Sequence, residues 1–197
     1  MHSKEIGEII MHLPKEVNNT KGVLTKNGTV VYKNKNNNSV VSVQALKEYQ
    51  DGMCFDSVRS LITIKNNLAS HKYSFNFELP KGYRLVKDYD YNYNPVEYDC
   101  GAVYILNAED DVVSTINPAW AKDAKGKQIN TDYDVIGSTL IQNVEFNKNT
   151  TFPIITDPTQ HPTYDAYVGK LSKSEAISVK RKYRQYADRY NYVAVLA

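Results

Sequence analysis

The segment 73–79 constrains the fold of this chain more than any other part of the sequence. Large apolar side chains occupy every second position: Tyr73, Phe75, Phe77 and Leu79. The residues between them are polar: Ser74, Asn76 and Glu78. A period of two places the apolar groups on one face of a strand and the polar groups on the other. The pattern therefore predicts a strand that covers a core with one face, ended by a turn at Pro80-Lys81-Gly82.

Further stretches with the length, alternation or turn signals of strands recur through the first 160 residues. They cover residues 6–13, 23–25, 29–32, 41–46, 58–64, 102–106, 112–116, 133–136, 139–146 and 152–156. Turn signals separate many of them, and Asn27-Gly28 is the strongest hairpin signal. Many short strands at a spacing of about ten residues predict a mainly β fold, an antiparallel sandwich or open barrel.

The C-terminal part of the chain follows a different pattern. Ser172 followed by Glu175 matches a capping box, which satisfies backbone donors at the start of a helix. Apolar and aromatic residues then recur at helical spacing: Ala176, Val179, Tyr183, Tyr186, Ala187 and Tyr190. The other faces carry cations: Lys180, Arg181, Lys182, Arg184 and Arg189. The sequence thus predicts a sandwich-like β module over residues 1–158 and a segment with one C-terminal α-helix over residues 159–197.

Composition and charge exclude several classes of protein. The 197 residues carry a formal net charge of +2, so no overall field attracts nucleic acid and we expect no nucleic-acid partner. No run of apolar residues is long enough for a transmembrane helix. Lys4, Glu5 and Glu8 make the first residues too polar for a signal peptide, so either the protein stays inside the cell or the chain is a mature or trimmed form.

Four short motifs in the middle of the chain occur in a familiar order. They are Phe77 to Gly82, Ile116-Asn117-Pro118-Ala119-Trp120-Ala121-Lys122-Asp123 with Gly126, Thr139-Leu140-Ile141-Gln142, and Phe152 to Pro158. This order resembles a β-rich module of secreted proteins from Gram-positive bacteria, over roughly residues 58–158. That module often precedes toxin-like or bacteriocin-like C-terminal segments, and no reaction is established for it. The resemblance implies a secreted or cell-envelope location, and a chain from which a signal peptide has been removed.

Two groups of aromatic and acidic residues are candidate ligand sites. Tyr89, Tyr91 and Tyr93 alternate with acidic and amide residues, and Trp120 precedes Asp123. Aromatic rings stack on the apolar faces of sugars, while carboxylates and amides bond their hydroxyl groups. The alternatives are structural: tyrosines packed across a hairpin, and a tryptophan that plugs the core where the chain crosses between sheets.

Cysteines, metal ligands and catalytic motifs give few signals. Cys54 and Cys100 predict either one disulfide or two buried thiols. Zinc-like spacing, a calcium loop, a phosphate-binding loop and a nucleophile elbow are all missing from the sequence, so we expect no metal and no cofactor. An enzyme is therefore the less favoured class.

Together these features predict a non-catalytic extracellular module that binds, presents or shields a partner segment at the bacterial cell envelope. Its partner would be a cell-wall polymer or another protein. The alternative is a precursor whose basic C-terminal part is directed to a membrane or wall through Lys180, Arg181, Lys182, Arg184 and Arg189. Cleavage would then fall near Asp157-Pro158. A hydrolase remains a third class without a supporting motif.

Overall fold

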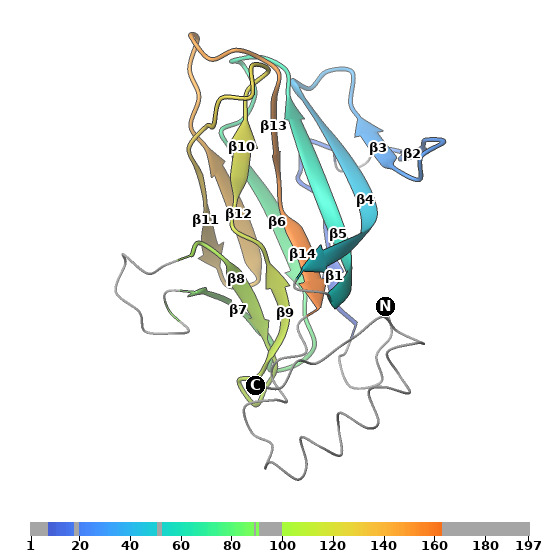
Figure 1. Cartoon of the computed structure of the whole chain (residues 1–197), viewed down its shortest axis with the longest axis vertical. Coiled ribbons are helices and arrows are strands. Elements are labelled where there is room, and N and C mark those ends of the chain that lie inside the picture. The colour runs from blue at the N-terminus through green and yellow to red at the C-terminus, as the bar shows by residue number, and fades with distance from the viewer. Residues whose placement is uncertain (1–7, 18–19, 51–52, 89, 91–99, 163–197) are drawn as a thin grey trace.

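The computed structural model describes residues 8–17, 20–50, 53–88, 90 and 100–162, which contain fourteen β-strands in two sheets (Figure 1). The smaller sheet has the order β1 (Ile10–Met11), β6 (Lys72–Glu78), β12 (Thr139–Val144) and β11 (Thr131–Ile136). Every pairing between the described strands is antiparallel. The predicted mainly β, antiparallel fold is confirmed.

The larger sheet contains the remaining ten strands. Its main order is β2 (Val23–Leu24), β3 (Val30–Lys33), β4 (Ser39–Gln50), β5 (Met53–Ile64), β14 (Thr159–Pro162), β9 (Val112–Ile116), β8 (Val103–Leu106) and β7 (Arg84–Lys87). The other two strands are β10 (Trp120–Lys122) and β13 (Ile154–Asp157), and β13 pairs with both β10 and β5. No helix in the described ranges has the length and hydropathy to span a bilayer.

Strand β6 has the alternation that its sequence predicts. Tyr73, Phe75 and Phe77 are buried, the polar residues between them are exposed, and Leu79 packs against the core while half-buried. The turn after β6 also forms as predicted, because the Tyr83 N–H donates to the Pro80 carbonyl at 3.0 Å. Within the described part of the predicted N-terminal strand, residues 8–13, only Ile10 and Met11 pair.

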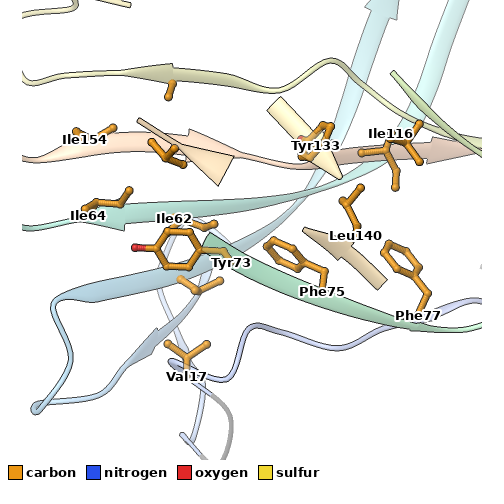
Figure 2. Packing of buried hydrophobic residues seen from close by; sticks show 14 of the residues in the cluster. Val17, Ile62, Ile64, Tyr73, Phe75, Phe77, Ile116, Tyr133, Leu140 and Ile154 are labelled. Carbon is orange, nitrogen blue, oxygen red and sulfur yellow. The ribbon is translucent and has the colours of Figure 1, made fainter. Parts of the chain in front are cut away.

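The core lies between the two sheets, which pack face to face without closing into a barrel (Figure 2). The smaller sheet contributes Tyr73, Phe75, Phe77, Tyr133 and Leu140, and the larger sheet contributes Ile62, Ile64, Ile116 and Ile154. The apolar surface that these side chains bury stabilises the packing of the two sheets. The architecture is therefore sandwich-like.

Residues 154–162 form a long path through the larger sheet that is interrupted at Pro158. Thr156 lies opposite Ile62 and Thr159 lies opposite Arg59, so β13 and β14 follow one another along β5. Pro158 has no N–H to give to a ladder, but its carbonyl accepts from the Ser60 N–H at 2.9 Å. The sheet thus continues four residues beyond the predicted boundary at residue 158. The predicted C-terminal helix falls in residues 163–197, outside the described residues, and stays a prediction.

Candidate ligand-binding site

A cavity of about 530 Å³ lies where the open side of β6 faces strand β3. We call it the edge cavity. Its lining residues come from three segments: His12, Leu13, Lys15, Val17, Thr20, Tyr32, Ser74 and Asn76. This volume is within the range of small-molecule sites, and the lining mixes apolar and polar groups as such sites do.

Strand β6 presents two polar side chains to the edge cavity. Ser74 and Asn76 occupy exposed positions of its alternating pattern. Strand β1 pairs with β6 only through Ile10 and Met11, and the His12 N–H then donates to the Asn76 carbonyl at 2.8 Å. Past this point the side of β6 borders the cavity, and no described strand pairs with it there.

Asn76 is held in an orientation that leaves donors for a ligand. The hydroxyl of Thr139 donates to Asn76 Oδ1 at 2.8 Å, which identifies the other amide atom as Nδ2. Among the described residues, none accepts a hydrogen bond from this Nδ2. A carboxamide nitrogen carries two hydrogens, so Asn76 offers two donors at the cavity wall.

The segment from His12 to Val17 forms the outer wall of the edge cavity. His12 Nε2 lies 2.6 Å from Glu78 Oε1, in a pair that is exposed on both sides. Val17 is buried at 1% exposure, and its N–H donates to the Pro14 carbonyl at 2.9 Å. Val17 therefore anchors this segment to the core and leaves Lys15 exposed at the cavity.

Tyr32 supplies an aromatic ring to the cavity, and Gly22 lets the neighbouring chain lie against it. A Cβ atom at Gly22 would stand 2.7 Å from Val30 Cγ1 and 2.9 Å from the Tyr32 ring. No real Cβ atom tolerates such distances, so the position requires a residue without a side chain. The ring is half-buried and packs against the core cluster, which fixes its position.

A buried hydroxyl pair lies on the core side of β6. Tyr73 Oη and Ser39 Oγ are 2.7 Å apart. The pKa of Tyr73 is raised to about 12: burial raises it most, the hydrogen bond with Ser39 partly offsets this, and the negative charge of Glu16 adds a smaller increase. Tyr73 therefore stays protonated over the physiological range, and its hydroxyl ties the two sheets together rather than reacting.

A second polar network is buried around Asp157. Its carboxylate lies 3.0 Å from Arg59 Nε and accepts from the Thr159 hydroxyl, while its carbonyl accepts from the Tyr133 hydroxyl at 2.9 Å. Burial, and then the charge of Asp157, raise the pKa of Tyr133 well above its usual value. Asp157 is only 1% exposed, so this network joins strands and is closed to a ligand.

The predicted ligand residues Trp120 and Asp123 do not line the edge cavity. Trp120 begins β10 in the larger sheet and is half-buried, so the prediction that it plugs the core between the sheets is wrong. Asp123 is buried, and its Oδ1 accepts from the N–H groups of Lys125 and Lys127 at 2.8 and 2.9 Å. The carboxylate of Asp123 thus stabilises a turn through these two hydrogen bonds.

Several other predicted residues lie outside the described part of the chain. These are Tyr89, Tyr91, Tyr93, the side chain of Cys54, and the cations Lys180, Arg181, Lys182, Arg184 and Arg189. Cys100 is exposed, and its N–H donates to the buried carboxylate of Asp88 at 3.2 Å. Because Cys100 is exposed, the alternative of two buried thiols is wrong for this residue. The disulfide, the tyrosine site and the anionic-surface site stay predictions.

The described residues contain no group of three His, Cys, Asp or Glu side chains that could hold a metal ion. The acidic turn 109–111 is organised by Asn107, whose Oδ1 accepts from the N–H groups of Glu109 and Asp111 at 3.0 and 2.8 Å. Asp110 pairs with Arg84 at 2.6 Å. Glu109, Asp110 and Asp111 are therefore structural residues of a turn.

Sequence reasoning missed the edge cavity. The polar positions Ser74 and Asn76 indicated only a solvent-facing side of a strand, and no spacing links them with His12 or Tyr32. Comparisons of the chain with protein-family models, with curated proteins and with solved structures found no match, so the resemblance to the secreted Gram-positive module stays a prediction.

Proposed function

We propose that this protein is a non-catalytic binding module that takes a neutral saccharide unit in the edge cavity. The observation that carries the proposal is the combination of one aromatic ring, Tyr32, with five polar side chains of different types around a single cavity: His12, Lys15, Thr20, Ser74 and Asn76. The hydroxyl groups of a sugar both donate and accept hydrogen bonds, and the polar side chains of the cavity lining include donors and acceptors to match them.

A neutral sugar fits this lining better than a strongly charged ligand does. Lys15 contributes one cation, and the pair of His12 with Glu78 adds an acceptor beside it. The charged groups around the cavity therefore produce no strong electrostatic field of either sign. Leu13, Val17 and the Tyr32 ring provide apolar surface for the C–H face of a sugar ring.

The titratable groups support binding rather than reaction. Hydrolysis of a glycosidic bond uses a pair of carboxyl groups on either side of the bond. Glu78, which pairs with His12 beside the edge cavity, is a single carboxylate, and the described lining itself contains none. Tyr73 and Tyr133, whose pKa values are raised, donate or share hydrogen bonds inside the protein and do not line the cavity.

A saccharide ligand also agrees with the location that the sequence resemblance implies. A secreted module at the cell envelope meets wall polymers that display repeated sugar units. We therefore propose a cell-wall or other envelope polysaccharide as the partner.

The position of Asp157 weighs against the precursor alternative. Asp157 and Pro158 are buried, and the backbone on both sides of their bond pairs with β5. A protease cannot bind this segment in extended form without opening the sheet. Release of a C-terminal segment from the folded module would need a cut after Pro162.

The test measures binding of the whole chain to soluble glucan, mannan, xylan and N-acetylglucosamine oligomers by calorimetry. We expect saturable binding to at least one of them. The Asn76→Ala variant should bind roughly five to thirty times more weakly, because a hydrogen bond to a ligand contributes about 1–2 kcal/mol.

The matched control is Asn67→Ala, which removes an exposed amide that does not line the cavity. It should bind like the wild type. If no oligomer binds, or if Asn76→Ala and Asn67→Ala bind equally well, the proposed function is wrong.

A further inference from the structure

A second cavity of about 480 Å³ lies where β6 begins and β12 ends. We call it the strand-end cavity. Its lining includes His71, Lys72, Asn143, Glu145 and Phe146. Its volume is close to that of the edge cavity and equally suited to a small ligand.

The two cavities share the exposed face of β6. Ser74 and Asn76 line the edge cavity, and Lys72, the next exposed residue on the same face, lines the strand-end cavity. Two residues of a strand span about 7 Å, so the cavities are neighbours along β6. Asn143 of β12 lies directly opposite Lys72, and Figure 1 shows β6 and β12 in the same sheet.

The linings of the two cavities have several side-chain types in common. The edge cavity has one aromatic ring, one asparagine, one lysine and one histidine: Tyr32, Asn76, Lys15 and His12. The strand-end cavity has Lys72, His71 stacked on the buried Phe146, and two asparagines, Asn143 and Asn147, and it adds the carboxylate of Glu145. Similar linings select similar chemical groups, and two of them side by side fit a ligand with a repeating unit.

The rings of the strand-end cavity form a rigid platform. His71 stacks on Phe146 with 3.9 Å between ring centroids and 11° between planes. Phe152 meets Phe146 edge-on at 5.6 Å, and His71 Nδ1 lies 3.1 Å from the Val144 carbonyl. Phe146 is buried and His71 is exposed, so the imidazole is the accessible face of the stack.

Asn143 is also fixed before a ligand arrives. Its Nδ2 donates to Asp132 Oδ1 at 2.6 Å and to Asp134 Oδ2 at 2.9 Å. Both carboxylates are exposed on the outer face of β11. Each keeps a second oxygen that none of the described residues bonds, so each can accept a hydrogen bond from a hydroxyl group.

We infer that the edge cavity and the strand-end cavity are two subsites for one neutral oligosaccharide chain. This inference rests on the proposed function of the edge cavity. Occupation of the first subsite raises the effective concentration of the next sugar unit at the second. Affinity should therefore rise with chain length until the ligand spans both cavities, and then level off.

The experiment titrates the whole chain with N-acetylglucosamine, glucan, mannan and xylan oligomers of increasing length, from the single sugar upward. For the oligomer class that binds, affinity should rise at least about tenfold between the single unit and the spanning length. Lys72→Ala and His71→Ala should return the affinity for the long oligomer to that for the short one. Affinity for the short oligomer should not change.

Lys81→Ala serves as a control, because Lys81 is an exposed lysine in the turn after β6 and lines neither cavity. Lys72 is exposed as well, so its variant keeps the test valid if His71→Ala fails to fold. If affinity does not depend on length, or if both variants bind the long oligomer as the wild type does, the second subsite is disproved while Asn76→Ala still tests the first. If no oligomer binds, both ideas are wrong.

Discussion

Arg59 compensates the buried charge of Asp157: its Nε lies 3.0 Å from Asp157 Oδ2 across the boundary between β5 and the end of β13. The Asp157 side chain is 1% exposed, while the Arg59 side chain is 32% exposed and reaches water. Thr159 also donates to the same carboxylate. An ion pair thus stabilises the larger sheet at the point where Pro158 interrupts its ladder.

We predict that Arg59→Met destabilises the protein by about 3 kcal/mol, because it leaves an uncompensated carboxylate inside the sheet. The measurement is urea unfolding at neutral pH. The control is Arg84→Met, which breaks a pair with Asp110 whose side chains are 47% and 67% exposed. That variant should lose less than about 1 kcal/mol. Equal losses in the two variants would contradict the role of the Arg59–Asp157 pair.

We predict that stability falls between pH 10 and pH 12, in part through Tyr73. Its pKa is about 12 in the folded protein against 10.0 for an ordinary tyrosine, so the folded state holds the proton more tightly. The stabilisation is complete below pH 10 and is lost as pH rises toward 12, at up to about 1.4 kcal/mol per pH unit. Unfolding of wild type and Tyr73→Phe across this window measures it. The variant should lose less stability than the wild type, and parallel curves would show that Tyr73 does not contribute.

We predict that Gly82→Ala destabilises the protein more than Gly126→Ala does. The two glycines have φ of 86° and 77°, so alanine is strained by about 1 kcal/mol at each. A Cβ atom at Gly82 would also stand 2.8 Å from Ala108 Cβ, whereas one at Gly126 meets nothing within 4 Å. Overpacking should add roughly 1 kcal/mol or more at Gly82. Thermal and urea unfolding measure the stability of the two variants. Equal losses of stability would show that the loop at Ala108 moves aside without cost and would contradict the prediction.

We predict that the bond before Asp157 resists proteolysis in the folded protein. Thr156 and Asp157 are 0% and 1% exposed and pair with β5 and β10. A protease that cuts on the N-terminal side of aspartate should spare this bond in buffer and cut it in denaturant. The bond before Asp110 is the control, because Asp110 is exposed in a turn and should be cut early. Mass spectrometry of the fragments decides, and early native cleavage before Asp157 would revive the precursor alternative.

Local features of the fold were predictable from sequence because they depend on neighbours in the chain. The alternation over 73–79 gave the buried and exposed faces of β6, and the hairpin of β11 and β12 follows from two alternating stretches around Gly137. Register within a hairpin is set by the turn and by the apolar face. These parts needed no information from distant residues.

The arrangement of distant segments was not predictable in this way. Thr159 pairs with Arg59, which is a hundred residues away, and no local pattern specifies that partner. The edge cavity likewise joins His12 and Tyr32 to Asn76 through the packing of sheets. Trp120 suggested a core position because large aromatics usually lie there, yet it begins a strand that has only β13 as a ladder partner among the described strands.

The place of residues 154–162 in the larger sheet has a consequence for the order in which the chain is made. Among the described strands, this path alone joins the block β2-β3-β4-β5 to the block β7-β8-β9, and it also supplies β13 as the partner of β10. Until the ribosome has made residue 162, both blocks keep an open strand edge. A growing chain is thus exposed to wrong pairing with its neighbours until residues 154–162 have been made, and a chain stopped before residue 154 cannot complete the larger sheet.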